Sequence, residues 1–274
     1  MKNKATIMML LASLLMLVGC QKKPNILRPG FNDSFNNVRS LVIIENEYNG
    51  SMIDSWESSN PSVIGIIKRE DGQYRTTVNR SNEDQKVTLT ATVGKKKYSY
   101  NLTVKALTGN AFYDLYPSLN DDKHIFNINS YEDILEKLST GTHVVYFGFP
   151  ACPWCFEYVY YYNNIGKELG IERIEYFDHR SIRTVENGII NESFERITDL
   201  LGAENVAEYE KDGTIYPWIY APTVYVIKDG KVLAKGGTAF PGHIARSGAL
   251  DKKSYDTFKK ELETLFNIYL NALK

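Results

Sequence analysis

Two cysteines, Cys152 and Cys155, lie three positions apart in the stretch PACPWCFEY. A Cys-x-x-Cys pair can supply two ligands of a zinc site, close into a structural disulfide, or act as a reactive dithiol. A zinc site typically needs four ligands, and the four histidines of the chain are scattered, without the spacing of paired ligands. A disulfide between residues only three apart restrains the unfolded chain little, so it would stabilise the folded protein only weakly. Thiol–disulfide exchange is therefore the favoured role, with no metal expected.

The residues around the pair favour an activated thiol. The run from Thr142 to Phe149 is apolar, β-branched and aromatic, which is typical of a buried strand. Pro153 then suits the first turn of a helix. Cys152 is thus predicted at a helix N-terminus, where free amides and the helix dipole favour a thiolate. Cys155 lies on the same helical face. We expect one exposed, activated thiol and a second thiol that resolves a mixed disulfide.

The elements that must position this pair alternate between helix and strand from about Ala111 onward. Helical patterns cover residues 129–141, 153–170, 191–202 and 254–274. The first of these helices opens with a capping-box pattern, Ser130 then Asp133. Strand patterns cover 142–149 and 171–177, and 221–237 reads as strand, Asp-Gly turn and strand. Residues 111–274 are therefore predicted to form an α/β domain with a mixed central sheet flanked by helices.

The motif VVYFGFPACPWC after a helix, with APTVYVIKDGKVL before a terminal helix, resembles the thioredoxin family over roughly residues 120–274. In that family the Cys-x-x-Cys opens a helix and a cis-proline at the start of a later strand faces the sulfurs. The resemblance implies a thioredoxin-like fold, with Cys152 as nucleophile and Cys155 as resolving thiol. It also implies that Ala221 and Pro222 position an extended substrate backbone. It implies no cofactor.

The sequence departs from the family pattern near the cysteines. Tyr146 stands where typical thioredoxins carry a buried aspartate. Glu157 could take over that role, although a solvated helix carboxylate is the favoured reading. The intervening dipeptide is Pro153-Trp154 rather than Gly-Pro, and Trp154 could face a substrate. Because this dipeptide helps to set the reduction potential, the direction of electron flow stays open between reductase and oxidase.

The segment from residue 203 to residue 220 is longer than a minimal thioredoxin needs. It ends with Trp218 and Tyr220, just before Ala221. These aromatic side chains could form a rim for partner polypeptides or pack against the sheet, and the sequence does not decide between the two.

Residues 31–106 have a strand-like pattern of apolar residues, unlike the alternating helix and strand patterns that follow. Apolar and polar residues alternate in VTLTATV and again in YSYNLTV, which is the period of half-buried strands. The stretches SWESSNPSVIGI and VTLTATVGKKKYSYNLTV resemble bacterial immunoglobulin-like repeats, and the resemblance implies that Trp56 is the core aromatic. We therefore expect a small all-β immunoglobulin-like sandwich that serves as a spacer or docking platform.

The N-terminus predicts export. Lys2 and Lys4 precede an apolar run that is too short to span a membrane, as in a secretory signal over residues 1–19. The ending Leu17-Val18-Gly19-Cys20 resembles the bacterial lipobox, which implies cleavage before Cys20 and lipidation of that residue. An ordinary secretory signal is the alternative. Residues 20–30 are then predicted to be a lipidated cysteine and polar tether.

These features together predict a function. The chain of 274 residues has a net charge of -1 with both signs interspersed, so no basic stripe indicates nucleic-acid binding. We expect a lipoprotein on the extracytoplasmic face of the bacterial membrane, where disulfides persist. It would be a thiol–disulfide oxidoreductase that acts on proteins or peptides and exchanges electrons with a membrane redox partner. The alternative is a non-catalytic surface binding or accessory lipoprotein built on a thioredoxin-like scaffold.

Overall fold

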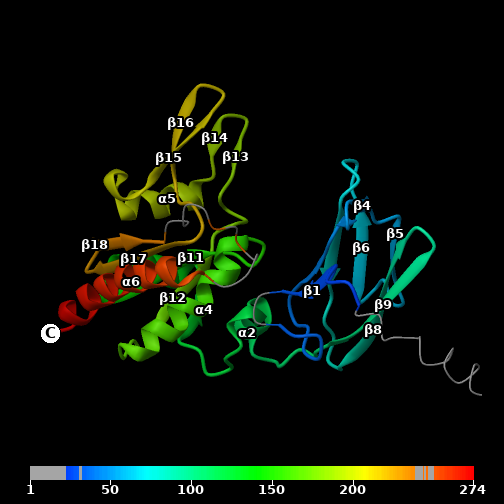
Figure 1. The fold of residues 1–274 in the computed structure, drawn as a ribbon. Helices are drawn as coiled ribbons and strands as arrows, with labels where there is room; N and C mark the ends of the chain where they lie inside the picture. Colours follow the sequence, from blue (N-terminus) through cyan, green and yellow to red (C-terminus); the bar gives the residue numbers. More distant parts are fainter. Residues whose placement is uncertain (1–22, 31–32, 238–242, 244, 246–249) are drawn as a thin grey trace, which may run out of the picture.

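The computed structural model describes residues 23–30, 33–237, 243, 245 and 250–274. It contains two units, each with its own hydrophobic core, and α2 follows the link between them (Figure 1). The predicted signal peptide, residues 1–19, and the predicted lipidation site, Cys20, lie outside the described residues. None of the described helices combines the length and the apolar character needed to traverse a lipid bilayer.

The first unit consists of β-strands, as the alternating pattern predicts. Its strands are β1 (Leu27–Pro29), β2 (Val42–Ile44), β3 (Glu47–Tyr48), β4 (Ser51–Met52), β5 (Ser55–Ser58), β6 (Ile64–Lys68), β7 (Tyr74–Val78), β8 (Gln85–Val93) and β9 (Lys96–Val104). Strands β5, β8 and β9 form one antiparallel sheet, and the remaining strands pair two by two. On β8, the alternate residues Val87, Leu89 and Ala91 are buried, so one face of this sheet packs on the core.

Trp56 lies in the core of the first unit, as the resemblance implied. It is 6% exposed, its indole nitrogen donates a hydrogen bond to the Glu45 carbonyl at 3.0 Å, and its ring lies against Tyr100. A hydrogen bond to an acceptor offsets the desolvation cost of a buried indole N–H. The residue therefore anchors the sandwich by apolar burial and by one satisfied hydrogen bond.

The tether predicted over residues 20–30 is wrong from Pro24 onward. Ile26 and Leu27 are buried in the core of the first unit, and β1 pairs with β2 in antiparallel register. The Tyr100 hydroxyl also donates to the Pro24 carbonyl at 2.8 Å. These apolar residues gain more from burial in the sandwich than a solvated linker would provide, so the folded unit begins before residue 31.

The second unit alternates helices and strands. Its elements are α2 (Ala111–Leu115), the 3₁₀ turn η1 (Pro117–Leu119), β10 (Phe126–Ile128), α3 (Tyr131–Ser139), β11 (Thr142–Gly148), α4 (Pro153–Glu168), β12 (Ile174–Asp178), β13 (Val185–Glu186), β14 (Ile189–Ile190), α5 (Glu192–Leu201), the 3₁₀ turn η2 (Ala203–Asn205), β15 (Ala207–Lys211), β16 (Thr214–Trp218), β17 (Thr223–Lys228), β18 (Lys231–Gly236) and α6 (Lys252–Ala272). The capping box of Ser130 and Asp133 begins α3 as predicted.

The central sheet of the second unit has the strand order β10-β12-β11-β17-β18. Strands β10, β12 and β11 run parallel, whereas β17 is antiparallel to β11 and β18 to β17, so the predicted mixed sheet is confirmed. Helices α4 and α6 cover one face, and α3 and α5 cover the other (Figure 1). Strand β11 is covered on both faces, which explains its continuous apolar sequence.

Two hairpins that the sequence analysis did not predict project together from one end of this sheet. The hairpin β13–β14 precedes α5, and β15–β16 precedes β17 (Figure 1). They are tied by the Tyr216 hydroxyl, which donates to the Gly188 carbonyl at 2.9 Å, and by the Lys211 amine, which donates to the Val185 carbonyl at 2.9 Å. The long segment before Pro222 is therefore an ordered hairpin.

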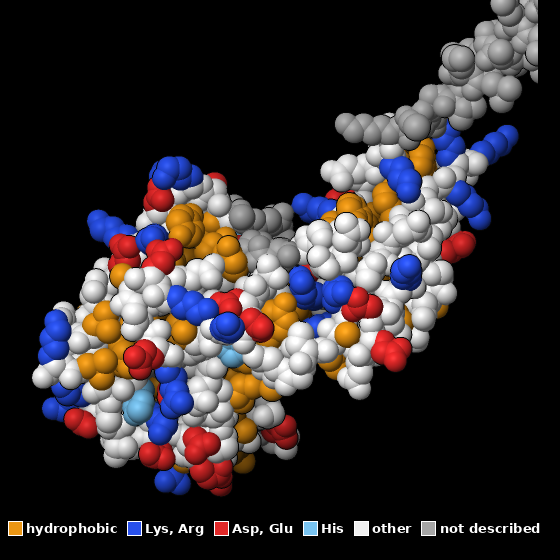
Figure 2. Space-filling view, turned by 90° about the horizontal axis from the view of Figure 1, so that it is seen from below, with side chains coloured by type: hydrophobic (Ala, Val, Ile, Leu, Met, Phe, Trp, Pro, Cys, Tyr) orange, Lys and Arg blue, Asp and Glu red, His pale blue; other side chains and the backbone are white. Residues whose placement is uncertain are grey.

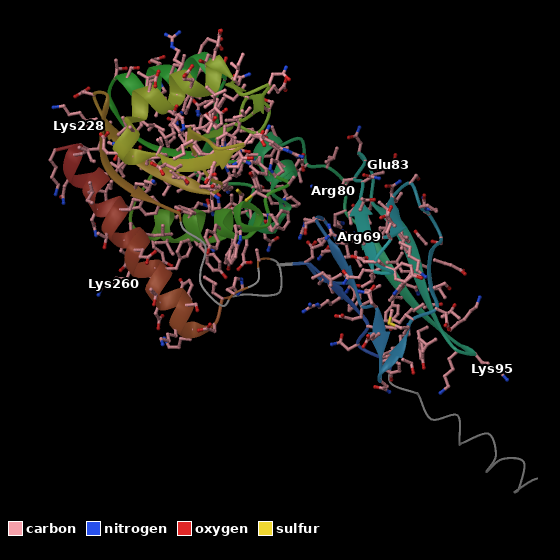
Figure 3. All side chains as sticks on the ribbon, turned by 90° about the horizontal axis from the view of Figure 1, so that it is seen from above. Arg69, Arg80, Glu83, Lys95, Lys228 and Lys260 are labelled. Carbon is pink, nitrogen blue, oxygen red and sulfur yellow. The ribbon has the colours of Figure 1, made fainter. Side chains whose placement is uncertain are left out.

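Arg80 connects the two units. Its Nε donates to the Lys105 carbonyl at 3.0 Å, and its Nη1 lies 3.2 Å from the carboxylate of Asp114 on α2. Figure 3 shows Arg80 on the side of the first unit that faces the second. On the face seen in Figure 2, Lys and Arg side chains alternate with Asp and Glu.

Candidate active site

The candidate site is centred on the junction between β11 and α4. Strand β11 ends at Gly148 and α4 begins at Pro153, so the predicted order of strand, cysteine and helix is confirmed. Cys152 is the N-cap of α4, and its Sγ accepts a hydrogen bond from the Cys155 backbone N–H at 3.1 Å. The first amides of a helix lack intrahelical partners. A sulfur in this position therefore receives donors that stabilise negative charge.

Both cysteines are buried. Cys152 is 5% exposed and Cys155 is fully buried, and both are free thiols. The prediction that Cys152 is exposed is therefore wrong. Both thiols belong to the core cluster between the sheet and α4, against which Phe149, Trp154 and Ala221 also pack.

The two thiols have opposite electrostatic surroundings. The hydrogen bond from the Cys155 thiol lowers the pKa of Cys152, and the backbone amides of Cys155 and Trp154 and the charge of Arg183 lower it further, against the effect of burial. Burial raises the pKa of Cys155 well above its ordinary value, and the hydrogen bond to Cys152 and the charge of Cys152 add to this effect. Cys152 is thus the thiol that ionises first.

The loop before β17 reaches the first sulfur. The Ala221–Pro222 peptide bond is cis, as the resemblance implied, and the Ala221 carbonyl oxygen lies 3.4 Å from Cys152 Sγ. A cavity of about 540 Å³ adjoins this loop and is lined by residues 218–223 and by Lys235 and Gly237, among others. The structure therefore brings Cys152, Ala221 and Pro222 together, although they are far apart in sequence.

Gly237 allows this loop to pack closely against the end of β18. Its φ is +103°, in the region that favours glycine, and a Cβ there would lie 2.8 Å from the Pro222 carbonyl oxygen and 3.0 Å from Thr223 Cα. Both contacts are with backbone atoms, which cannot move aside as a flexible side chain can. The position therefore requires glycine.

Tyr146 lies beside Cys155 inside the protein. It is fully buried, and burial raises its pKa well above the ordinary value, so it stays neutral. Its hydroxyl reaches the Cys155 thiol, and this contact lowers the pKa of Cys155 against the larger effect of burial. A Cβ on Gly148 would lie 2.5 Å from the Tyr146 ring and 3.3 Å from Cys155 Sγ, which shows how tightly the three residues pack.

The prediction that Glu157 is a solvated carboxylate is wrong. Glu157 is fully buried, and its carboxylate oxygen lies 2.8 Å from Nε2 of His243. The ring of Trp154 lies 5.6 Å from that of His243 and 5.5 Å from that of Tyr158. A buried carboxylate requires such a partner because its desolvation is costly, so this contact links His243 to α4.

The two aromatic residues before the cis-proline have different roles. Trp218 is 8% exposed and stacks on Tyr209 with ring centres 4.5 Å apart, so it packs within the domain. Tyr220 is 52% exposed and can form part of a rim. The packing alternative thus holds for Trp218, whereas a rim for partner polypeptides stays a prediction for Tyr220.

Sequence reasoning missed the cations beside the cysteines. Arg183 donates from Nη1 to the Ile219 carbonyl at 3.2 Å, and its guanidinium lies 5.0 Å from the centre of the Phe149 ring and 5.5 Å from that of Trp218. Arg180 contacts the same Phe149 ring at 5.6 Å from its exposed position. No short motif marks these arginines, because tertiary folding brings them to the site.

His179 supports this corner of the site from inside. It is fully buried, and its Nε2 lies 3.2 Å from the Ile219 carbonyl oxygen. Burial, assisted by the charge of Arg183, lowers its pKa to about 3, so the imidazole is neutral near pH 7. Hydrogen bonds of the ring with the backbone of Ile219 and of Phe177 act in the opposite direction, but burial outweighs them.

Comparison with known proteins identifies the first unit. Residues 23–107 match the family model of the atrophied bacterial Ig domain. This match agrees with the strand composition of the unit and confirms the immunoglobulin-like part of the sequence analysis, with an earlier start than the predicted residue 31. Searches among curated proteins and among solved structures found no match.

Proposed function

We propose that the second unit is a thioredoxin-like thiol–disulfide oxidoreductase that acts on disulfides of proteins or peptides. The observation that carries the proposal is the position of Cys152. Its Sγ is the cap of α4, accepts the Cys155 amide at 3.1 Å, and lies 3.4 Å from the carbonyl of Ala221 in the cis-proline loop. The amide contact supports a thiolate, and the hydrogen bond that the Cys152 thiol donates to the Ala221 carbonyl places the sulfur next to a backbone segment that an extended substrate could pair with.

In the reductive direction, the Cys152 thiolate attacks one sulfur of a substrate disulfide, and the other substrate sulfur leaves as a thiolate. Cys155 then loses its proton and attacks Cys152 Sγ, which releases the second substrate thiolate. The protein is oxidised to a Cys152–Cys155 disulfide, and the substrate gains two electrons and takes up two protons. The oxidative direction is the reverse.

The two pKa shifts suit this order of events. The negative charge of Cys152 is one of the causes that raise the pKa of Cys155. When Cys152 enters a mixed disulfide, this charge disappears and Cys155 becomes easier to deprotonate. Cys155 therefore remains protonated until the substrate is attached, and only then becomes a nucleophile.

We also propose that the chain is a lipoprotein on the extracytoplasmic face of the bacterial membrane, anchored through Cys20. The lipobox-like ending Leu17-Val18-Gly19-Cys20 supports this proposal. In this arrangement the immunoglobulin-like unit serves as a spacer or docking platform, and a membrane redox partner exchanges electrons with the cysteine pair.

The proposal is tested by exchange between the full chain and a fluorescent peptide with an internal disulfide. We expect Cys152→Ser to reduce the rate to background, and Cys155→Ser to accumulate a mixed disulfide that a non-reducing gel detects. Equal rates for wild type and Cys152→Ser would overturn the proposal. If the reduction potential of the cysteine pair lies below about -300 mV, so that the disulfide is permanent, the alternative of a non-catalytic scaffold is favoured instead.

A further inference from the structure

Arg183 carries a positive charge for which the described residues provide no carboxylate partner. It takes part in no salt bridge among them. Its contacts are a backbone carbonyl and two aromatic rings, those of Phe149 and Trp218. Aromatic faces attract a cation, but they do not neutralise it.

The contacts of Arg183 hold its charge close to the reactive sulfur. Phe149 belongs to the loop that leads into Cys152, and its carbonyl accepts a hydrogen bond from the Cys152 amide at 3.0 Å. Ile219 lies two residues before Ala221, whose carbonyl is 3.4 Å from Cys152 Sγ. Arg183 is thus fixed between the two segments that flank the sulfur, at partial burial where charges interact more strongly than in water.

We propose that Arg183 is the counterion of the Cys152 thiolate, and that it shifts the cysteine pair toward oxidation of substrate dithiols. The inference rests on the proposed function. In the reduced protein the thiolate neutralises the guanidinium. In the disulfide form that negative charge is absent, and the guanidinium keeps its carbonyl and ring contacts but has no anionic partner among the described residues.

The effect on electron flow follows from the balance of the reaction. A substrate dithiol gives two electrons to the Cys152–Cys155 disulfide and becomes a disulfide itself. Of the two protons released, Cys155 takes one, and the other goes to solvent because Cys152 remains a thiolate. Any group that stabilises this thiolate stabilises the reduced protein and raises its reduction potential. Arg183 therefore favours the oxidative direction.

Other titratable groups near the sulfur do not supply this charge. The tyrosines Tyr116, Tyr146 and Tyr176 are buried, and burial raises the pKa of each. His179 is neutral near pH 7 because burial lowers its pKa. Arg180 and Tyr220 face Arg183 as well, but Arg180 is exposed, where water screens its charge.

The test compares charge-removing variants of the full chain with the wild type. Arg183→Met removes the charge, Arg183→Gln removes it but keeps a donor for the Ile219 carbonyl, and Arg183→Lys keeps the charge. Arg180→Met is the matched control, because Arg180 contacts the same Phe149 ring from the exposed side. The Cys152 pKa is measured from the pH dependence of its alkylation by iodoacetamide, read by peptide mass spectrometry. The reduction potential is measured in glutathione buffers.

We expect both neutral variants to leave less thiolate at pH values below the Cys152 pKa, by at most about tenfold, which is the factor of one pKa unit, because the hydrogen bond from Cys155 has the larger influence. Their potentials should be lower by up to about 30 mV, which is the same factor for a two-electron couple. Arg183→Lys should restore part of both shifts, and Arg180→Met should change neither.

Wild-type values of pKa and potential in both neutral variants would overturn the inference. An equal effect of Arg180→Met would overturn it as well, because the effect would then not be specific to Arg183. If Arg183→Met does not fold, the comparison of Arg183→Gln with Arg183→Lys decides the question, because both keep a hydrogen-bond donor and only Arg183→Lys keeps the charge. An ordinary pKa for wild-type Cys152 would instead contradict the proposed function itself, so the two failures are distinguishable.

Discussion

Cys152 occupies a position that helices usually give to serine, threonine, aspartate or asparagine. Those residues cap a helix with a side-chain oxygen that accepts an amide N–H. Here a sulfur accepts the amide of Cys155. The interaction that begins α4 therefore also prepares the nucleophile, so the stability of the helix start and the acidity of the thiol are linked in one atom.

A comparison of two substitutions at Cys155 tests the largest cause of the low Cys152 pKa. That cause is the hydrogen bond from the Cys155 thiol. Cys155→Ala removes the side-chain donor, whereas Cys155→Ser replaces it with a hydroxyl. We expect the Cys152 pKa, measured by alkylation against pH, to be higher in Cys155→Ala than in Cys155→Ser. Equal values would mean that backbone amides and Arg183 alone set the acidity.

His179 should make the protein sensitive to acid. Its folded pKa of about 3 lies below the ordinary value of 6.5. Between these values the unfolded chain binds a proton that the folded protein does not, so the free energy of unfolding falls as the pH falls. The slope is at most about 1.4 kcal/mol per pH unit. We expect His179→Gln to lose less stability than wild type between pH 6.5 and pH 4 in urea denaturation. Parallel losses in the two proteins would contradict this assignment.

At the scale of elements, the close packing of β18 on the cis-proline loop is a testable constraint. Gly237→Ala would place a Cβ 2.8 Å from the Pro222 carbonyl oxygen and displace the loop that faces Cys152. We expect a loss of more than about 1–2 kcal/mol in stability, which is the cost of left-handed backbone alone. We also expect at least a tenfold loss in the exchange rate, because small misplacements of reacting groups are costly.

The matched control for this substitution is Gly213→Ala at the tip of the β15–β16 hairpin. Gly213 also has a positive φ, +77°, but nothing lies within 4 Å of its Cβ position. Gly213→Ala should therefore reduce stability by the backbone cost without changing the exchange rate. A similar fall in rate for both variants would show that loop displacement is not the cause.

The long elements of the second unit could be predicted because their patterns are strong. The apolar run of β11, the capping box before α3 and the Asp-Gly turn between β17 and β18 each carry a local physical signal. The edge strand β10 is only three residues long, and β15 alternates glutamates with tyrosine on an exposed hairpin. Such segments gain their structure from tertiary pairing, so local sequence does not reveal them.

The site was predictable only in part, for a similar reason. Cys152, Cys155 and Pro222 stand in recognisable local contexts. Arg183 and His243 reach the site from loops whose sequence has no periodic pattern, and only the folded chain shows their contacts with Phe149 and Glu157. The burial of Glu157 was also hidden, because α4 packs against α6 as well as the sheet.

For the whole molecule, Arg80 should hold the two units in their relative position. It bonds the Lys105 carbonyl in the link and pairs with Asp114 on α2, and its side chain is 5% exposed. We expect Arg80→Ala to widen the distribution of the radius of gyration that small-angle scattering yields. We also expect faster proteolysis between residues 105 and 110.

Arg69→Ala is the appropriate control for that experiment. Arg69, which is labelled in Figure 3, pairs with Asp71 at 3.6 Å, but its side chain is 44% exposed and its partner is only two residues away in sequence. Exposed pairs contribute little, so scattering and proteolysis should match the wild type. A rigid link in Arg80→Ala would show that other contacts, such as that of the Leu107 amide with the Ser81 carbonyl, are sufficient.

The early start of the first unit bears on where the chemistry can take place. The fold already engages the chain at Lys23, whose amine donates to the Ser99 carbonyl at 2.6 Å, and at Pro24. With Cys20 lipidated as proposed, the linker between the lipid and the folded unit is three residues long, which span roughly 10 Å at full extension. In that arrangement the immunoglobulin-like unit is a folded spacer between the membrane and the second unit. In the proposed arrangement the distance of Cys152 from the bilayer would be set by folded protein, and substrate disulfides would have to reach the site at that distance.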